Sequence, residues 1–155
     1  MTNEEFLSIK HPEIFTYDYA GRKLFTQSVK DNTKIEIIRL IDSIAEYVKD
    51  KATIIIHCLY ESSGHVTNSR HYRGEACDFH LKPIEKMSYV DQIELLNEAL
   101  ERLNQSEKVG LGIYPTWNNK GFHLDVRGFK ARWGFIGKYE VSYTDALKYT
   151  VDKKL

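Results

Sequence analysis

The sequence predicts a single α+β domain over residues 1–155, built on a small, mostly antiparallel sheet flanked by helices. Three observations support this fold class. Two segments repeat apolar residues every three or four positions, as amphipathic helices do. Several short stretches are β-branched or alternate between apolar and polar residues, as strands do. No repeat, linker or low-complexity tract divides the 155 residues, and this length is usual for one domain.

The N-terminal part of the chain predicts two helices and a strand. Residues 2–8 favour a short helix, after which residues 9–30 have no clear period. Apolar residues then recur at helical spacing from Ile37 to Val48, and residues 31–33 (Asp-Asn-Thr) are the expected cap of this helix. The continuous β-branched run at residues 52–58 predicts a buried strand.

The middle of the chain predicts a loop, a strand and a helix. Residues 61–73 are rich in Ser, Gly, Asn and His, which is typical of a functional loop. Residues 76–81 alternate as a second strand. A helix is expected to begin after Ser88, with Asp91 three residues further on and leucines and an isoleucine at helical spacing up to Leu103.

The C-terminal part predicts two more strands and a short helix. Residues 109–114 form a glycine-containing strand, and residues 115–121 form a turn. Residues 122–126 (Phe-His-Leu-Asp-Val) alternate as a strand that carries its His and Asp on one face. Residues 132–134 are expected in a loop, and residues 144–149 in a short helix.

Composition excludes several classes of protein. Lys and Arg total 22 and Asp and Glu total 22, so the chain lacks the basic excess of a nucleic-acid binder or a polybasic membrane-surface protein. No apolar run approaches the ~20 residues that cross a bilayer. The N-terminus has no basic and apolar signal-peptide regions, so synthesis in the cytoplasm without a signal peptide is expected. Cys58 and Cys77 are expected to be buried free thiols.

One constellation of residues points to a metal. His71 and Asp78 are seven positions apart with the small residues Gly74 and Ala76 between them, and His123 follows on a later strand. Two imidazole nitrogens and one carboxylate oxygen leave a tetrahedral Zn²⁺ one open position, which is the pattern of a catalytic zinc. Spacing alone leaves open an ordinary polar role for each of these residues.

A resemblance to a known family extends this pattern. Residues 69–78 match S-x-H-x-x-G-x-A-x-D, and residues 122–127 match a downstream H-x-D-x-R element. Both resemble the zinc D-Ala-D-Ala carboxypeptidases of peptidase family M15, which are related in fold to the hedgehog signalling domain and include phage endolysins. The Gly-x-Gly-x-Tyr at 110–114 and the Ala-Arg-Trp-Gly at 131–134 resemble its small single-domain branch. The resemblance spans about half of the chain, from residue 54 to residue 134.

The resemblance implies a fold, a cofactor and an activity. It implies a hedgehog/DD-peptidase-like domain that holds one Zn²⁺ per chain through His71, Asp78 and His123. The implied reaction is hydrolysis of peptidoglycan stem or cross-link peptides by zinc-activated water, as a D-Ala-D-Ala carboxypeptidase or an endolysin-type endopeptidase. The expected protein is a monomer whose partner is the peptidoglycan peptide, without nucleic acid or membrane. It would act at the cell wall, and phage or prophage coding offers one route there.

The proton-transfer group is not obvious from the sequence. Several family members have an acidic residue three positions before the third ligand, whereas this chain has Lys120. The H-E-x-x-H arrangement, which supplies a glutamate base, is absent as well. Candidate groups at the catalytic site are Asp125, His65 and Arg127, and the further carboxylates to consider are Glu61 and Glu75.

Substrate binding also departs from the family. Many members have an Arg just after the first core strand that binds a substrate carboxylate, but residues 57–61 contain none. Arg70, Arg73 or Arg127 could substitute, because a guanidinium matches a carboxylate. The aromatic residues Tyr114 and Trp117, together with Tyr72 and Trp133, are candidates for lining a substrate cleft, or they are ordinary core and rim side chains.

Two other functions remain compatible with the sequence. One is a non-catalytic zinc-containing binding module of the same fold, which the missing acid at position 120 favours. The other is a metal-free α+β interaction domain with unrelated histidines. Turnover distinguishes the enzyme from the binding module, and stoichiometric metal distinguishes both from the metal-free domain.

Overall fold

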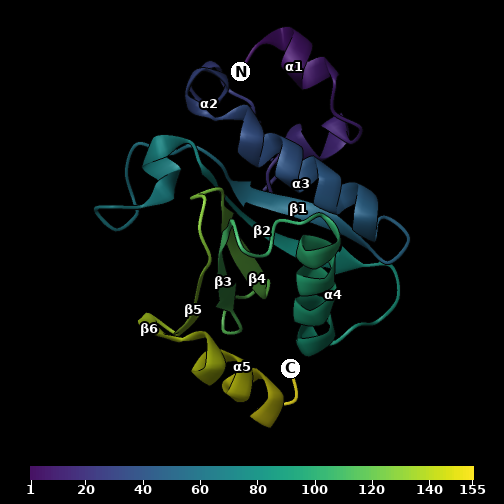
Figure 1. Ribbon diagram of the computed structural model, residues 1–155, viewed down its shortest axis with the longest axis vertical. Helices are drawn as coiled ribbons and strands as arrows, with labels where there is room; N and C mark the ends of the chain where they lie inside the picture. The colour runs from purple at the N-terminus through teal and green to yellow at the C-terminus, as the bar shows by residue number, and fades with distance from the viewer.

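The computed structural model describes residues 1–155 as one six-stranded sheet with helices packed against it (Figure 1). The α-helices are α1 Asn3–Leu7, α2 Gln27–Asn32, α3 Ile35–Val48, α4 Tyr89–Arg102 and α5 Tyr143–Asp152. Two 3₁₀ helices are η1 Pro12–Phe15 and η2 Arg70–Arg73. The strands are β1 Ala52–Cys58, β2 Ala76–Pro83, β3 Gly110–Tyr114, β4 Gly121–Asp125, β5 Ala131–Ile136 and β6 Tyr139–Ser142. The α+β class predicted from the sequence is confirmed.

The sheet is mixed, which corrects the prediction of a mostly antiparallel sheet. Its strand order is β1-β2-β4-β3-β5-β6. Antiparallel pairs join β1 to β2, β2 to β4, β4 to β3 and β5 to β6, whereas β5 pairs with β3 in parallel, with Gly110 opposite Ala131. The chain reaches this arrangement because β3 and β4 form an antiparallel pair, after which the next segment crosses to the free edge of β3. Local alternation does not reveal which edge a strand joins, so this pairing was not predictable from the pattern.

The segment at 132–134 is part of β5 and not a loop as predicted. Arg132 helps to hold this stretch against β3 and the segment before it, because its guanidinium donates to the carbonyl oxygens of Val109 and Ser106, both at 2.8 Å. Gly134 lets α5 pack directly on the strand, because a Cβ there would overlap the side chain of Ala146. The short strand β6 then pairs with β5 at the sheet edge and was not predicted.

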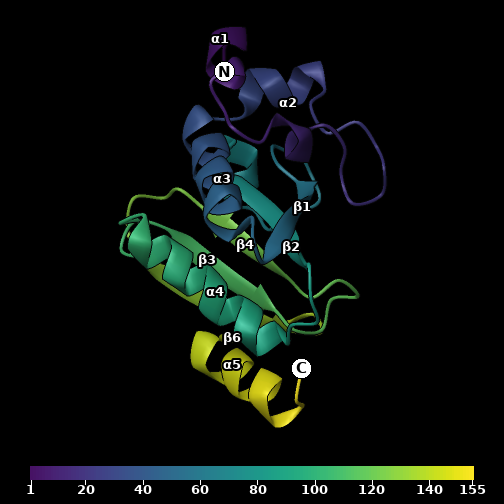
Figure 2. The same cartoon turned by 90° about the vertical axis from the view of Figure 1, so that its right-hand side faces the viewer.

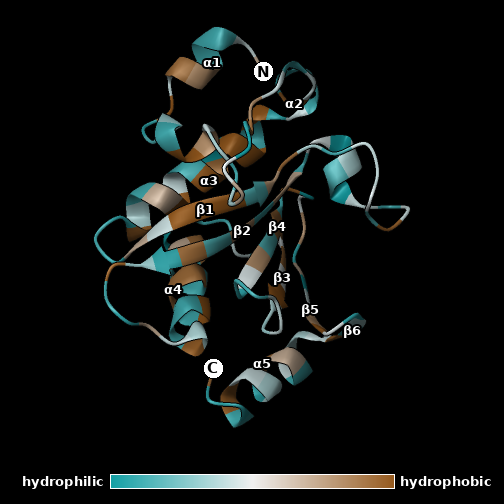
Figure 3. Cartoon of the chain, turned by 180° about the vertical axis from the view of Figure 1, so that it is seen from behind, coloured by the Kyte–Doolittle hydropathy of each residue, from teal (hydrophilic) through white to brown (hydrophobic).

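Helices α3 and α4 begin differently. Helix α4 has the predicted cap, since the Ser88 hydroxyl accepts from the Asp91 N–H at 3.1 Å. The cap predicted for α3 at residues 31–33 is wrong: Asp31 and Asn32 end the separate helix α2, and α3 begins after Lys34 without a side-chain cap. Burial of the isoleucine face of α3 compensates for the missing cap. Figure 3 shows hydrophobic segments on both α3 and the adjacent β1. None of the helices has the length and hydropathy needed to span a membrane.

The two faces of the sheet have different environments. Apolar residues of every central strand point to one face and form a continuous core with α3, α4 and α5. The alternate residues, among them Asp78 on β2 and His123 on β4, point to the other face. The loop after β1, with η2, projects away from α4 (Figure 1), and Figure 2, seen from the other side, has α4 in front of the strands. The polar face of the sheet and this loop together define the region of the candidate site.

The N-terminal segment is attached to α3 by charge-assisted hydrogen bonds. The buried Asp42 carboxylate accepts the backbone N–H groups of Lys10 and His11 at 2.9 and 2.8 Å. The His11 ring lies 2.6 Å from Glu46 and 3.2 Å from Glu13. The hydrogen bond to Glu46 is the main reason that the pKa of His11 is raised above its ordinary value. Proton binding at His11 therefore stabilises this attachment.

We expect this attachment to weaken as the pH rises. Because the folded-state pKa of His11 is raised, its contribution is complete below the unfolded pKa and is lost as pH rises through the folded value. Wild type should lose stability relative to His11→Gln as the pH rises from the ordinary histidine pKa, about 6.5, through the raised folded value, by at most about 1 kcal/mol for a partly exposed pair. Urea unfolding of both proteins across this range measures the difference. A pH-independent difference would contradict the assignment.

Candidate metal centre

Three elements bring His71, Asp78 and His123 together. Strands β2 and β4 pair so that Asp78 lies directly opposite His123. His71 lies in η2. The Ser69 hydroxyl caps the start of this helix by accepting a hydrogen bond from the His71 N–H at 3.2 Å. Gly74 ends η2 in the left-handed conformation at φ 65°, where an added Cβ would overlap the carbonyl of Asn32. The Ser, His and Gly of the S-x-H-x-x-G pattern thus have separate structural roles.

The three side chains converge on one point. Asp78 Oδ1 lies 3.1 Å from His71 Nε2 and 2.9 Å from His123 Nδ1. His71 Nε2 is fully buried, yet it has no hydrogen-bond partner. The reason is that the other ring nitrogen, Nδ1, is 2.7 Å from the Leu59 carbonyl and donates to it, so Nε2 presents a lone pair to the carboxylate. Positive charge between the two facing lone pairs, from a proton or a metal ion, would stabilise this arrangement, and ligand atoms of one tetrahedral ion have about this separation.

Outer partners orient both imidazoles. Leu59 O holds His71, and the fully buried Asp125 carboxylate lies 2.8 Å from His123 Nε2. Asp125 is held in turn by Arg127, whose Nε and Nη2 donate at 2.7 and 2.8 Å. A histidine whose second nitrogen donates to a carbonyl or carboxylate is the usual form of a metal-binding histidine. The sequence candidates Asp125 and Arg127 are therefore behind His123, where they position it.

The charges of the centre are strongly coupled. Burial opposes ionisation of Asp78, but the adjacent imidazoles of His123 and His71 outweigh it and hold the pKa of Asp78 well below its usual range. Burial also lowers the pKa of His123, but hydrogen bonding to Asp125 and Asp78 outweighs this and raises it to about 9. The metal-free centre thus favours a proton on His123. A metal ion would supply the same positive charge and displace that proton from Nδ1.

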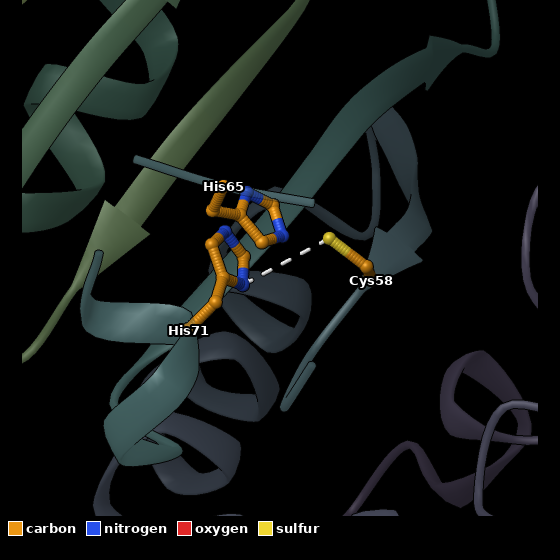
Figure 4. A group of neighbouring side chains, drawn as sticks. All are labelled: Cys58, His65 and His71. Carbon is orange, nitrogen blue, oxygen red and sulfur yellow. Dashed lines mark hydrogen bonds between the residues drawn. The ribbon is translucent and has the colours of Figure 1, made fainter. Parts of the chain in front are cut away.

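His65 lies against the centre from the loop after β1. Its ring stacks on His71 with centroids 4.2 Å apart, as Figure 4 shows. The backbone of His65 is tied to Tyr72, whose hydroxyl accepts the His65 N–H at 2.8 Å and donates to its carbonyl at 2.6 Å. Glu61 Oε1 is 3.3 Å from His65 Nε2. The candidate His65 is therefore beside the candidate metal ligands, held by Glu61 and Tyr72.

Glycines on β3 make room for this arrangement. An added Cβ at Gly110 would lie 2.5 Å from Arg127 Nε and 2.7 Å from Asp125 Oδ1. At Gly112 it would lie 2.7 Å from Trp133 Nε1. The Gly-x-Gly pattern therefore lets the Arg127–Asp125 pair and the Trp133 indole approach the β3 backbone closely, and Trp133 packs against the His123 ring at a centroid distance of 5.2 Å.

Gly110→Ala is expected to displace Arg127 and loosen Asp125 from His123. Loss of an outer partner of a metal ligand typically lowers metal affinity or activity by about 10–100-fold. Metal affinity of Gly110→Ala, Arg127→Ala and the double variant tests the mechanism. If Gly110→Ala acts through Arg127, the double variant should be little worse than Arg127→Ala alone. Independent, additive losses would show that Gly110 acts in another way.

A cleft of about 500 Å³ lies over the centre. It is lined by the metal-ligand candidates His71, Asp78 and His123 and by the substrate-binding candidates Arg70, Tyr114 and Trp117. Tyr114 and Trp117 stack on each other, and this stack continues on both sides along the series Tyr19, His57, Trp117, Tyr114 and Phe135. Arg73 is exposed on η2 and does not line the cleft, so the structure does not bring this candidate to the site.

The carboxylate candidates separate into different roles. Glu75 is not in the centre, because it pairs with Lys34 at 2.6 Å and with Arg70 at 3.3 Å. Glu61 contacts His65, and Asp125 contacts His123. Lys120, at the position where family members carry an acid, does not line the cleft. His57 and His80 form a separate pair joined by a 2.7 Å hydrogen bond.

Cys58 is a neighbour of the centre that sequence reasoning missed. Its Sγ lies 3.5 Å from Asp78 Oδ2 and 3.8 Å from His71 Nδ1. Burial, followed by the nearby Asp78 charge, raises the pKa of this thiol far above its usual range, so it stays protonated. A break in the β1–β2 register between Ile56 and Cys58 places the Cys58 thiol beside Asp78. The local sequence does not predict such a bulge.

The chain thus contains two overlapping groups of side chains that could hold a metal ion. One consists of His71, Asp78 and His123, and the other of Cys58, His65 and His71. The first group has the buried, unpaired nitrogen and the outer partners expected of a metal site. No family model, curated protein or solved structure was found to match this chain.

Proposed function

We propose that this protein is a zinc-dependent peptidase that hydrolyses peptide bonds in peptidoglycan stem or cross-link peptides. The observation that carries the metal part of the proposal is the buried Nε2 of His71, which faces Asp78 Oδ1 without a hydrogen bond. The substrate class follows from the resemblance of residues 69–78 and 122–127 to the zinc D-Ala-D-Ala carboxypeptidase family.

The donor set favours zinc. Two imidazole nitrogens and one carboxylate oxygen form a borderline ligand set that suits Zn²⁺, and three protein ligands are typical of its catalytic sites. Bound zinc would lower the pKa of a water molecule and polarise the carbonyl of the scissile bond. The cleft directly above the ligands leaves space for a peptide to approach.

The protein's own groups would then orient the ligands and move protons. Asp125 is completely buried and holds His123 Nε2 while it binds Arg127, so it positions the ligand and does not touch substrate. His65 is the better candidate for proton transfer. It lines the cleft, and Glu61 holds its Nε2 and leaves Nδ1 to exchange a proton with the reacting groups.

The charges in the cleft favour cleavage of internal bonds. A carboxypeptidase needs a cation to bind the free carboxylate of its substrate. The two arginines that line the cleft are both engaged, Arg127 with Asp125 and Arg70 with Glu75. We therefore expect a stem peptide with an amidated C-terminus to be cleaved at least as fast as the free acid. Comparison of kcat/KM for the two peptides measures this, and a strong preference for the free acid would instead indicate a carboxypeptidase.

Metal analysis and a peptidoglycan digest test the proposal together. We expect one zinc per chain and release of new amino termini from peptidoglycan, abolished by a chelator and restored by zinc. His71→Ala, purified in the same way, controls for contaminating peptidases. One zinc without cleavage would support the non-catalytic binding module, and a purified chain with no metal would exclude both zinc functions.

A further inference from the structure

The second oxygen of Asp78 has a partner of its own. Asp78 Oδ1 faces His71 and His123, whereas Oδ2 has a single hydrogen-bond partner, the Cys58 thiol at 3.5 Å. A thiol is a weak donor, but it is the hydrogen-bond partner that holds this oxygen. The orientation of Asp78 therefore depends on Cys58 as well as on His123.

The bulge in β1 is what makes this contact possible. In a regular strand, consecutive side chains point to opposite faces of the sheet. Here His57 contacts His80 while Cys58 contacts Asp78, and both partners lie on the same face of β2. The register break after Ile56 turns Cys58 onto the polar face, directly opposite Asp78. Bulges commonly re-aim a side chain toward a functional site in this way.

We propose that Cys58 is a positioning residue of the metal centre, which holds Asp78 so that Oδ1 alone is presented to the metal. This inference rests on the metal site of the proposed function. Outer partners that orient a ligating carboxylate affect metal affinity, just as those of ligating histidines do. Cys58 also touches His71, so one thiol contacts ligands from both η2 and β2.

The geometry favours a thiol donor over a thiolate ligand. Cys58, His65 and His71 are close enough to hold an ion of their own, and Figure 4 shows the three side chains together. However, the His71 atom that faces Cys58 is Nδ1, which already donates to Leu59 O at 2.7 Å. A metal on Cys58 would have to break this bond. The thiol also faces Oδ2 and not Oδ1, which places it behind the carboxylate.

Zinc affinity of Cys58 variants tests the inference. Cys58→Ala and Cys58→Val remove the donor, the second with little change in volume, and each should weaken zinc binding by about 10–100-fold in competition with a chelator. Cys58→Ser keeps a donor and should recover most of that affinity. Cys77→Ala is the matched control: its thiol is buried in the hydrophobic core and its hydrogen bond goes to the backbone carbonyl of Asp78, not to the carboxylate, so its zinc affinity should be that of wild type.

The outcomes separate this inference from the proposed function. Wild-type zinc affinity in both Cys58→Ala and Cys58→Val would overturn it. A thiolate-to-metal charge-transfer band in the Co²⁺-loaded wild type would also overturn it, because Cys58 would then be a ligand. A wild type that binds no zinc would refute both proposals. Zinc binding with the Cys58 effect, but without peptidoglycan cleavage, would support the role of Cys58 and refute the peptidase.

Discussion

Asp78→Asn is expected to abolish peptidase activity and to weaken zinc binding more than about 100-fold, beyond the usual cost of losing an outer partner. The reason is that Asp78 Oδ1 is shared by the two histidines, at 3.1 and 2.9 Å, so it is the central atom of the ligand set. A neutral amide of the same size removes the charge that favours a cation while it retains the packing. Metal content and the digest of peptidoglycan measure both effects.

Glu75→Gln provides the control for Asp78→Asn. Glu75 is a neighbouring acid with two ion pairs, but it does not contact the metal ligands. It should keep its zinc, so a loss of zinc confined to Asp78→Asn identifies the centre. If Asp78→Asn retained stoichiometric zinc and turnover, the assignment of the ligand set would be wrong.

Asp125→Asn is expected to produce the largest loss of stability among the variants of the site. Asp125 is fully buried, and its removal leaves the Arg127 guanidinium and His123 Nε2 without their charged acceptor. Removing one partner of a buried ion pair typically costs about 3–5 kcal/mol. For a chain of this length, that corresponds to a decrease in Tm of roughly 10 °C. Metal affinity should fall as well, because His123 loses the group that orients it.

Thermal unfolding with and without zinc measures the effect of Asp125→Asn. Asp152→Asn is a suitable control, because Asp152 is 58% exposed and pairs only with Lys148 on α5, so its loss should be small. Added zinc should stabilise wild type more than Asp125→Asn, since a ligand stabilises the state that binds it. Equal Tm values for wild type and Asp125→Asn would exclude a structural role for the buried pair.

Much of the fold was predictable because local patterns reflect burial. The β-branched run of β1, the alternation of β4 and the Ser88 cap of α4 each predicted an element that the structure contains. The wrong predictions concern segments whose structure depends on contacts with residues distant in the sequence. Residues 132–134 lie in strand β5, where Arg132 binds the carbonyls of Val109 and Ser106 and Gly134 makes room for α5, and neither contact leaves a local sequence pattern.

The candidate site divides in the same way. Spacing and family resemblance indicated His71, Asp78 and His123, and the structure brings all three together. The contacts that support these three residues could not be predicted from the sequence, because its pattern is equally consistent with Asp125 and Arg127 forming a surface ion pair. No sequence pattern indicated that Cys58 lies near the site, because a one-residue bulge determines which face of β1 its side chain occupies. Arg73 shows the converse, as an arginine within the motif whose side chain lies outside the cleft.

The sequence by itself determined the α+β class, the principal helices and strands, and the three side chains able to hold a metal. These features depend on periodicity, capping and residue chemistry, all of which are local properties of the chain. The tertiary structure alone decided that the sheet is mixed, that Asp125 and Arg127 stand behind His123, and that Cys58 holds Asp78. These features depend on strand register and edge choice, and one residue of register changes which side chains share a face.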